Sequence, residues 1–309
     1  MKDIASTATS QQIREKRDAL IAKYGSWTAH NFRLADGVYT FEDGREDFEK
    51  MKNGHAVHIR RIVQGVADMV GRPLNELRVL DLGCLEGIYA IEFALNGSSV
   101  VGVEGREPSL AKCNFAKECL GLNNLSFVQD DVRNLTPEKY GTFDVVLCLG
   151  LLYHLDAPEV FTFTKQMSDV CKRICVLDTH VCTDKGELRQ FNGQDYYGVV
   201  YREHMEETPQ DVRLQALWAS LDNAKSFWLS RPSLYNLLTD SGFTSVHTCM
   251  NPAMPEQYTD RDTIFAMKSN PYTVLCSPET NSIPLKRWPE MSVAHAHPAL
   301  ANLEPVGSN

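Results

Sequence analysis

The pattern of hydrophobic residues changes near residue 78. Before that point, apolar residues recur at helical spacing from Ser10 to Tyr24 and from about Asp47 to Val70, and the second run stops near Gly71-Arg-Pro73. Both runs predict helices. Residues 27–40, between them, are rich in Trp, His, Asn, Asp and Gly, which predicts an ordered loop or a short strand. The sequence therefore begins with a helical extension over residues 1–74.

From residue 78 onward, short apolar runs alternate with helical stretches. Strands that are apolar throughout and separated by helices are typical of a parallel sheet covered on both faces, the doubly wound α/β class. Helices are expected to begin near Tyr89, Pro108 and Pro158. The strands are expected at Arg78–Leu82, Ser99–Val103, Leu125–Val128, Phe143–Leu149 and Arg173–Leu177.

The last third of the chain contains an interruption and a tail. Residues 182–231 are polar and rich in aromatics, and we interpret them as a cap inserted into the main domain of residues 75–268. A helix at Pro232–Ser241 and two strands follow, which favours a sheet whose last strand is antiparallel. Residues 269–309 are rich in Pro, Ser and Ala and are expected to be extended or partly disordered.

A glycine-containing loop follows the first strand, in the sequence Val79-Leu-Asp-Leu-Gly-Cys-Leu-Glu-Gly87. Gly83 allows a sharp turn and Gly87 allows close backbone approach. The helix that begins near Ile88 offers free N–H groups. A strand, a tight turn and a helix N-terminus in this order predict a site for a polar, nucleotide-like ligand.

Carboxylates follow the next two strands. Glu104 ends the second strand, where it can accept hydrogen bonds from both hydroxyls of a ribose. Asp131 follows the third strand, where it can accept from an adenine amino group beside the Val132 N–H. Ligands of open α/β sheets lie at the carboxyl ends of the strands. We therefore expect these residues at the same edge as the glycine loop.

Four successive segments resemble the motifs of class I methyltransferases. They are Val79–Gly87, Val103-Glu-Gly-Arg106, Gln129-Asp-Asp-Val132 and Phe143-Asp-Val-Val-Leu-Cys-Leu-Gly150. The resemblance covers roughly residues 75–268. It implies a seven-stranded Rossmann-like fold and S-adenosyl-L-methionine as the cofactor. It departs from the family at Leu85, where the middle glycine of the loop is expected.

The resemblance also implies which residues hold the cofactor. Asp81, Gly83 and Gly87 would face the methionine and ribose parts, Glu104 the ribose and Asp131 the adenine. The full set of cofactor residues expected from these motifs is Asp81, Gly83, Cys84, Glu86, Gly87, Glu104, Gly105, Asp131, Val132 and Leu149. A dinucleotide-binding dehydrogenase is disfavoured, because Leu85 and Ile88 stand where its later glycines should be.

Two further segments resemble a subgroup often likened to tRNA wobble-uridine modifying methyltransferases, many of whose members act on small molecules. These segments are Leu151-Leu-Tyr-His-Leu155 and residues 27–40. The formal charge of −9 provides no global positive field for nucleic acid. We therefore favour a small-molecule acceptor with an N, O or S nucleophile. A tRNA-modifying methyl or carboxymethyl transferase is the alternative, and a non-catalytic binding module of the same fold comes third.

Tyr153 and His154 follow the fourth strand, close to where the reactive methyl group is expected. His154 is the candidate general base, since an unperturbed histidine titrates near neutral pH. The alternative is a histidine that only shapes the turn. The candidate substrate contacts are Tyr201, Arg202, Glu203, Trp228 and Arg231 in the cap and Trp27, His30 and Asn31 in an N-terminal lid. Trp228 can equally belong to the core of the cap, and Trp27 can simply anchor the first helix.

The remaining features add expectations about location and metals. Nine cysteines are scattered without CxxC spacing, which is typical of reduced thiols in a cytosolic protein. The N-terminus lacks a secretory signal, and no apolar run approaches the roughly 20 residues of a membrane span. His295-Ala-His297 lacks a third ligand, so no metal site is expected. A homodimer is left open.

Overall fold

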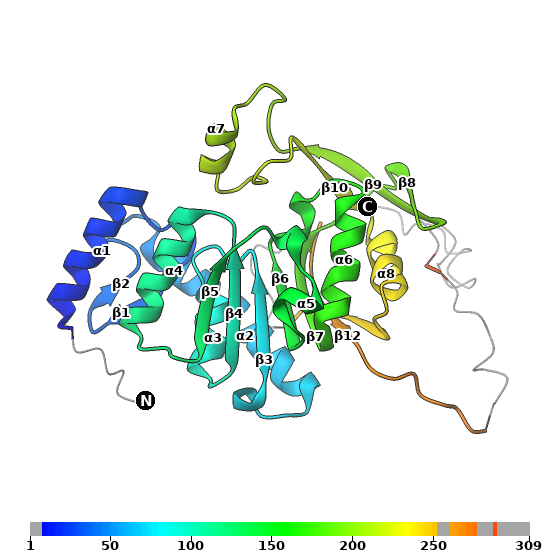
Figure 1. The fold of residues 1–309 in the computed structure, drawn as a ribbon, viewed down its shortest axis with the longest axis horizontal. Helices are drawn as coiled ribbons and strands as arrows, with labels where there is room; N and C mark the ends of the chain where they lie inside the picture. Colours follow the sequence, from blue (N-terminus) through cyan, green and yellow to red (C-terminus); the bar gives the residue numbers. More distant parts are fainter. Residues whose placement is uncertain (1–7, 252–259, 277–286, 289–309) are drawn as a thin grey trace, which may run out of the picture.

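The computed structural model describes residues 8–251, 260–276 and 287–288, and only the backbone of residues 53–55. A seven-stranded sheet forms its centre, with the strand order β11-β12-β7-β6-β3-β4-β5 (Figure 1). The strands are β3 Arg78–Leu82, β4 Ser99–Glu104, β5 Leu125–Gln129, β6 Phe143–Leu149, β7 Cys171–His180, β11 Ser245–Thr248 and β12 Arg261–Met267. Strands β3 to β7 pair in parallel, and β12 is antiparallel to both of its neighbours. The predicted α/β fold with an antiparallel last strand is confirmed.

Helices cover both faces of this sheet. The helices are α1 Ser10–Tyr24, α2 Phe48–Val70, α3 Ile88–Leu95, α4 Glu107–Cys119, α5 Pro137–Tyr140, α6 Glu159–Val170, α7 Gln210–Gln215 and α8 Arg231–Asp240, with short 3-10 turns η1 Leu74–Glu76, η2 Val132–Asn134 and η3 Leu152–His154. Val145 and Leu147 of β6 pack in a core with side chains of α1 to α4. Val146 and Cys148 pack in a second core with side chains of α6 and α8. From Val145 to Leu149 the strand is apolar because both of its faces are buried.

The inserted segment contains a second sheet that the sequence pattern did not predict. Strands β8 Glu187–Phe191, β9 Gln194–Arg202 and β10 Lys225–Leu229 form an antiparallel sheet in the order β10-β9-β8. Tyr196 and Phe227 of this sheet are buried against α6 through Phe161. The chain between β9 and β10, including α7, lies above the carboxyl ends of the central strands (Figure 1). This stretch is the cap of the molecule.

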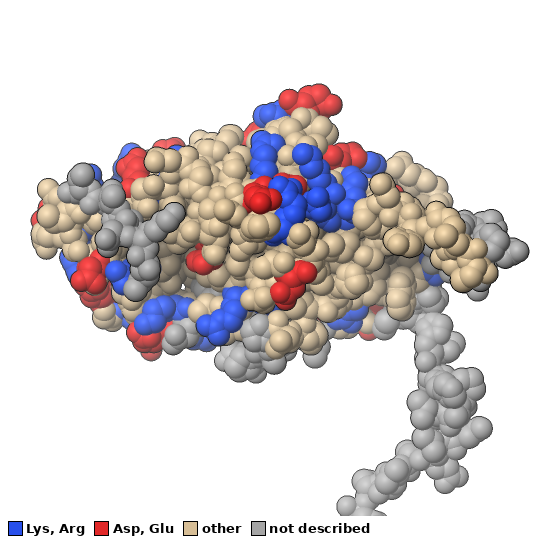
Figure 2. All heavy atoms as spheres, turned by 90° about the horizontal axis from the view of Figure 1, so that it is seen from below, with Lys and Arg blue, Asp and Glu red and all other residues tan. Residues whose placement is uncertain are grey.

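Charges are distributed unevenly over the face at the other end of the strands. The loop that precedes β3 lies at the bottom of the molecule, opposite α7 (Figure 1). Lys and Arg side chains gather near the middle of the face seen from below, with Asp and Glu among them (Figure 2). This basic cluster therefore lies on the side of the amino ends of the strands, away from the cap. In the part of the chain that the structure describes, no helix is both long and apolar enough to cross a membrane.

The N-terminal extension packs on the sheet through α2 and a small hairpin. Strands β1 Arg33–Ala35 and β2 Val38–Tyr39 pair antiparallel, so residues 27–40 are ordered as expected. Helix α2 approaches β12 closely, since a Cβ on Gly65 would lie 2.4 Å from Cζ of Phe265. Only a residue without a side chain fits this contact. It brings the first half of α2 over the carboxyl edge of the sheet.

A buried ion pair fixes the segment between α1 and the hairpin to the glycine loop. The Glu86 carboxylate accepts hydrogen bonds from the backbone N–H groups of Thr28, Ala29 and His30 at 2.6, 3.1 and 3.0 Å. Lys112 Nζ lies 3.3 Å from the same carboxylate, and both side chains are buried. The interpretation of Glu86 as a cofactor contact is therefore corrected: its oxygens are used by the N-terminal segment and by Lys112.

This ion pair yields a prediction about stability. Replacing Glu86 by Gln leaves the Lys112 ammonium buried without a counter-charge, which costs about 3–5 kcal/mol. We expect the free energy of unfolding, measured by urea denaturation, to fall by about that amount. Glu107→Gln is the control, because that carboxylate is exposed and its change should stay within about 0.5 kcal/mol. Equal stability of the two variants would contradict the structural role of Glu86.

Candidate active site

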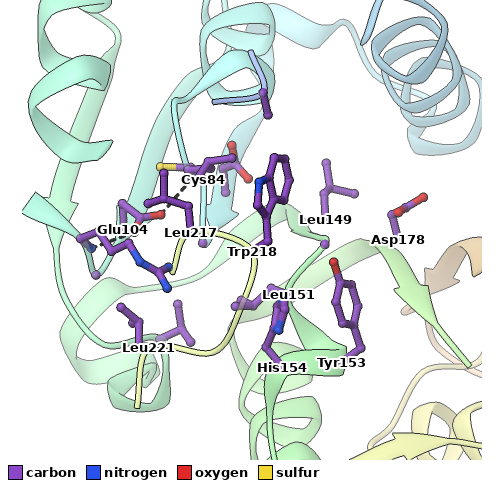
Figure 3. A pocket seen from close by; sticks show the side chains of 18 of the residues that line it. Cys84, Glu104, Leu149, Leu151, Tyr153, His154, Asp178, Leu217, Trp218 and Leu221 are labelled. Carbon is purple, nitrogen blue, oxygen red and sulfur yellow. Dashed lines mark hydrogen bonds between the residues drawn. The ribbon is translucent and has the colours of Figure 1, made fainter. Parts of the chain in front are cut away.

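A cavity of about 410 Å³ opens at the carboxyl edge of the central sheet. Small-molecule sites are typically about 300–1,000 Å³. Glu104 and Cys84 lie on one side of it, and Tyr153 and Asp178 lie on the other, with Trp218 of the cap between them (Figure 3). The cavity therefore joins the ends of β4, β6 and β7 under one cover.

Glu104 ends β4 with its carboxylate on the cavity. It is buried, and it accepts hydrogen bonds from the backbone N–H groups of Leu85 at 2.9 Å and Arg106 at 2.8 Å. Burial raises the pKa of this carboxyl, while the hydrogen bonds from Arg106 and Leu85 act in the opposite direction. The loop thus holds an acceptor of hydrogen bonds in a fixed orientation at the edge of the sheet.

Leu85 shows how the chain manages without the middle glycine. Its φ is +50°, in the left-handed region that side chains rarely adopt. The hydrogen bond from its N–H to Glu104 keeps the turn in that conformation. Gly83, at φ +63°, makes the other turn of the loop, and a Cβ there would lie 3.1 Å from Leu151. The loop therefore turns at Gly83 and Leu85 without the middle glycine.

Asp81 lies beneath this loop and also lines the cavity. Its Oδ2 accepts a hydrogen bond from the Ala90 N–H in the first turn of α3, at 3.1 Å. Burial raises the pKa of Asp81 to about 7, against the effect of that hydrogen bond. A carboxyl with such a pKa changes its charge near neutral pH.

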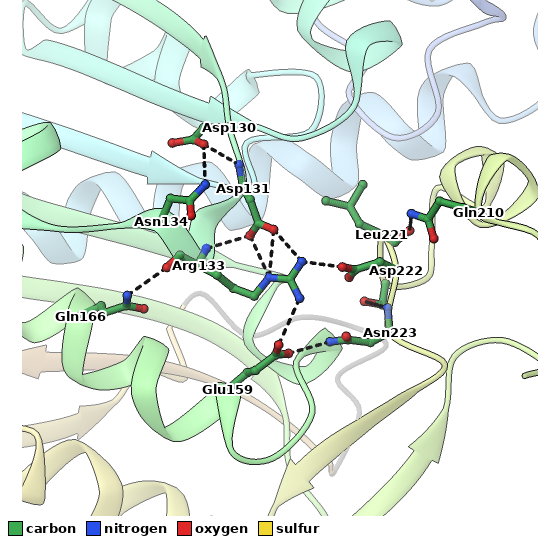
Figure 4. A network of polar contacts seen from close by, with 11 residues as sticks. Asp130, Asp131, Arg133, Asn134, Glu159, Gln166, Gln210, Leu221, Asp222 and Asn223 are labelled. Atoms are coloured by element: carbon green, nitrogen blue, oxygen red, sulfur yellow. Dashed lines mark hydrogen bonds and ion pairs between the residues drawn. The ribbon is translucent and has the colours of Figure 1, made fainter.

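Asp131 belongs to a polar network that connects the sheet to the cap (Figure 4). Arg133 donates to both of its oxygens at 2.6–3.0 Å, and also to Glu159 at 3.2 Å and Asp222 of the cap at 2.5 Å. Desolvation raises the pKa of Asp131, but the hydrogen bonds and charge of Arg133 outweigh it, so the net shift is downward. Asp131 and Val132 both line the cavity.

The cap is fastened at a second point by Arg106, directly after Glu104 and Gly105. Its guanidinium donates to the carbonyl oxygens of Leu214, Ala216 and Ala219 at 2.9–3.1 Å. Gly105 makes room for the cap, since a Cβ there would lie 2.6 Å from Cδ1 of Leu221. Residues 217–222 consequently form one wall of the cavity.

His154 and Glu203 form a hydrogen-bonded pair at the acceptor side. His154 Nδ1 lies 3.0 Å from Glu203 Oε1. Glu203 also accepts from Ser226 Oγ at 2.7 Å and from the Ser220 N–H at 3.0 Å. Desolvation acts to raise the pKa of Glu203, but its contacts with His154 and Ser226 leave it lowered. His154 lines the cavity, whereas Glu203 lies behind it, so Glu203 orients His154 rather than touching a ligand.

The far end of the cavity contains polar residues that sequence reasoning missed. Asp178 lies near the end of β7, opposite Leu149 of β6, and accepts from Arg261 Nε at 2.5 Å and from Thr263 Oγ1 at 2.9 Å. Helices α2 and α3 add further side chains, namely Met51, His58, Arg61 and Tyr89. Asp178 could have been found by the argument used for Asp131, because it directly follows the strand predicted at Arg173–Leu177. Arg61 and Arg261 carry no such local signal.

The structure divides the predicted site residues into two groups. Eleven line the cavity: Asp81, Gly83, Cys84, Glu104, Gly105, Asp131, Val132, Leu149, Tyr153, His154 and His30. The others lie outside the lining: Glu86, Gly87, Trp27, Asn31, Tyr201, Arg202, Glu203, Trp228 and Arg231. Gly87 is a packing glycine, because a Cβ there would lie 3.0 Å from Phe127. His295 and His297 lie outside the described residues.

The side chains outside the cavity have structural partners that explain their position. Trp27 is fully buried against Phe115, which favours the anchoring role over a lid. Asn31 donates to the Phe48 carbonyl, and Arg231 pairs with Asp262 at 2.6 Å. Tyr201 stacks on Trp228 with ring centres 4.6 Å apart, and Trp228 stacks in turn on His180 at 4.8 Å. Arg202 is exposed, and its Nη1 donates to Met205 Sδ at 3.8 Å.

The chain resembles known proteins both in sequence and in structure. Residues 79–173 match a family model described as "Methyltransferase domain". The ubiquinone biosynthesis O-methyltransferase of Acinetobacter baumannii (strain AYE) is 27% identical over 116 residues, which cover 38% of this chain and 47% of that protein. The chain thus spans about half the length of the curated relatives that it matches.

Solved structures match a larger part of the chain. The N-terminal domain of EvdMO1 with SAH bound has a TM-score of 0.64 and 25% identity, over 86% of this chain and all of that one. The same domain in the presence of SAH and D-fucose has a TM-score of 0.63 and 24% identity, with the same coverage. Together with the strand order and the four motifs, these findings identify a class I, S-adenosylmethionine-dependent methyltransferase domain in this chain.

Proposed function

We propose that the protein transfers a methyl group from S-adenosylmethionine to a small-molecule acceptor, releasing S-adenosylhomocysteine. The carrying observation is that one cavity contains both the strand ends of the cofactor motifs and the His154 side chain. A donor and an acceptor held in the same cavity need no further diffusion to react. The cap over this cavity keeps water from the reacting atoms.

The residues present fit the cofactor. Glu104 has lone pairs left after its two backbone hydrogen bonds and would accept from the ribose hydroxyls. Asp131 and the Val132 N–H would take the adenine edge, and Asp81 with Gly83 would face the methionine part. Cys84, Gly105 and Leu149 fill the lining between these groups. When bound, the cofactor supplies an electrophilic methyl group on a sulfonium.

His154 is the proposed general base on the acceptor side. Its Nδ1 is engaged by Glu203, so Nε2 is the ring nitrogen that takes a proton from the acceptor. Glu203 fixes this orientation and stabilises the imidazolium that forms. Three atoms converge on the Glu203 carboxylate, which holds its position even as the proton moves.

A small acceptor is favoured over tRNA by the names of the similar proteins. The basic cluster on the face seen in Figure 2 lies at the opposite end of the strands from the cavity. A tRNA substrate would need a basic surface around the mouth of the site. The names of the relatives described above refer to ubiquinone biosynthesis and to D-fucose, and none refers to tRNA. The comparisons therefore do not support the tRNA alternative.

Removing the Glu104 charge tests the cofactor assignment. Glu104→Gln retains the shape of the side chain but weakens the hydrogen bonds from the ribose. Hydrogen bonds to charged groups contribute about 1.5–3 kcal/mol each, so we expect the affinity for S-adenosylhomocysteine to fall at least tenfold in isothermal titration calorimetry. Glu107→Gln, three residues later in α4, should bind like the wild type. Unchanged affinity in Glu104→Gln would overturn the assignment.

The raised pKa of Asp81 predicts pH-dependent binding. Below about pH 7 the carboxyl is neutral, whereas the ammonium of the methionine part favours its ionised form. Binding therefore releases a proton, and affinity should rise with pH by at most about tenfold per unit and level off above about 7. Asp81→Asn should abolish this dependence. Calorimetry in buffers of different ionisation enthalpy counts the released proton directly.

The same shift has a consequence for the unliganded protein. The folded chain holds the Asp81 proton up to about pH 7, whereas the unfolded chain releases it near the ordinary pKa of 3.8. Stability therefore falls as pH rises from about 4 to 7, and Asp81→Asn should remove this contribution. Urea denaturation at several pH values measures it. A pH profile identical in both proteins would contradict the raised pKa.

Replacing His154 tests the base. We expect His154→Gln to lower the rate of S-adenosylhomocysteine release about 100-fold or more, the usual size of general-base catalysis. Cofactor affinity should stay within about twofold, because His154 lies away from the ribose and adenine positions. The acceptor for this assay comes from a screen of metabolites for S-adenosylhomocysteine release, with bulk tRNA beside them. A wild-type rate would reduce His154 to a residue that shapes the turn.

A further inference from the structure

Two hydrogen-bond donors, Arg261 and Tyr153, line the cavity beside the end of β6. Gly150, which lines the cavity, has a φ of +81°. A Cβ built on it would lie 3.7 Å from Arg261 Nη2 and 3.8 Å from Tyr153 Oη. Both groups therefore border the part of the cavity next to Gly150, where the absence of a side chain lets a ligand approach the guanidinium and the phenol. This space lies in the loop next to which the reactive methyl group is expected.

Arg261 is held so that its outer nitrogen faces this space. Its Nε donates to Asp178 Oδ1 at 2.5 Å, and its Nη1 lies 3.4 Å from His180 Nε2. The second oxygen of Asp178 is taken by Thr263 at 2.9 Å. Burial acts to lower the pKa of Arg261, but Asp178 outweighs it and the pKa is raised. The guanidinium is therefore charged and fixed in orientation.

Tyr153 is held by rings on three sides. The centre of its ring lies 4.3 Å from that of His154, 4.8 Å from that of His180 and 5.8 Å from that of Trp228. Burial raises the pKa of the phenol, against the effect of Arg261. The phenol is therefore protonated at neutral pH and acts as a donor. Burial and Arg261 lower the pKa of His180, so that imidazole adds no second positive charge.

We propose that Arg261 and Tyr153 form an oxyanion cradle beside Gly150, and that the acceptor atom is an oxygen which reacts as its anion. Two fixed donors aimed at one point stabilise negative charge that develops there. An amine acceptor would instead develop positive charge in front of a guanidinium, which is repulsive. A thiolate is a weaker acceptor of hydrogen bonds than an oxygen anion. This inference rests on the proposed function.

The reaction balances with groups already named. The acceptor O–H gives its proton to His154 Nε2, and the oxygen lone pair forms a bond to the methyl carbon. The bond between that carbon and the sulfonium sulfur breaks, and its electron pair stays on the sulfur. The products are a methyl ether or ester and S-adenosylhomocysteine. The proton on His154 then passes to solvent.

The test uses a coloured probe whose anion and neutral form absorb differently, 4-nitrocatechol. The full chain is first titrated with S-adenosylhomocysteine. Absence of binding at this step would contradict the proposed function itself. The complex is then titrated with 4-nitrocatechol at several pH values. We expect the pKa of the bound probe to be lowered by about one to two units, which corresponds to a 10- to 100-fold preference for the anion. 4-Nitroaniline, which cannot form such an anion, should bind at least tenfold more weakly.

Variants assign the shift to the cradle. Arg261→Met and Tyr153→Phe should each reduce the pKa shift of the probe, with the larger loss for Arg261. Because Arg261→Met leaves Asp178 without its partner, the double variant Arg261→Met/Asp178→Asn provides a second measurement with the charge pair removed as a unit. Arg72→Met is the control, because Arg72 pairs with Asp144 at the amino end of β6, and it should retain the full shift.

The outcomes separate the cradle from the proposed function. Binding of S-adenosylhomocysteine without any shift of the probe, or a shift that survives both Arg261 variants, overturns the cradle and leaves methyl transfer intact. Equal binding of 4-nitroaniline and 4-nitrocatechol has the same meaning. In the metabolite screen, the methylated atom of each product is identified by NMR. Oxygen is expected, and a nitrogen, sulfur or carbon product overturns the inference.

Discussion

The buried ion pair of Glu86 and Lys112 is the interaction on which the site depends. One carboxylate satisfies three consecutive backbone N–H groups and one ammonium, in a place that water does not reach. Lys112 also donates to the Ser26 carbonyl at 2.7 Å. The pair therefore ties α4, the glycine loop and the N-terminal segment together. His30 reaches the wall of the cavity only because this segment is held there.

Two arginines that follow the cofactor carboxylates attach the cap to the cofactor edge of the sheet. Arg106 follows Glu104 by two positions and Arg133 follows Asp131 by two positions, and each arginine fastens the cap. Each carboxylate that would contact the cofactor thus lies two positions before an arginine that holds the cap. Glu203 adds a third connection, because it accepts from Ser220 of the cap and from His154. Glu203 therefore links the position of the cap to the orientation of the proposed base.

Several residues of the site have an unfavourable backbone conformation or a buried charge, which their neighbours stabilise. Leu85 is held in a left-handed conformation by its hydrogen bond to Glu104. Asp81 is buried with a pKa of about 7, so its carboxyl gains or loses its charge near neutral pH. Arg261 is mostly surrounded by protein and keeps its charge through Asp178. Strain and perturbed ionisation gather where a fold binds ligands, and here they line one cavity.

The sequence by itself determined the class of fold, the order of the elements and the edge at which a ligand would lie. Helix α1 begins and ends where its periodicity predicted, and β3 to β6 follow their apolar runs to within a residue, because both patterns are set by neighbouring residues. Glu104 was predicted on the same basis, as a carboxylate at a strand end. The second sheet, β10-β9-β8 of the inserted segment, was not predicted, since its aromatic and polar residues show no clear period.

Only the tertiary structure decided which side chains meet. Arg261 and Asp178 are 83 positions apart and become partners because β12 pairs with β7. Glu203 was predicted to touch the substrate, yet it supports His154 from behind, and Glu86 holds the N-terminal segment instead of a cofactor. Charge and polarity identify such residues as important, but the direction of a side chain depends on packing between distant segments. For that reason the cofactor edge of the sheet could be predicted from the sequence, whereas the residues on the acceptor side could not.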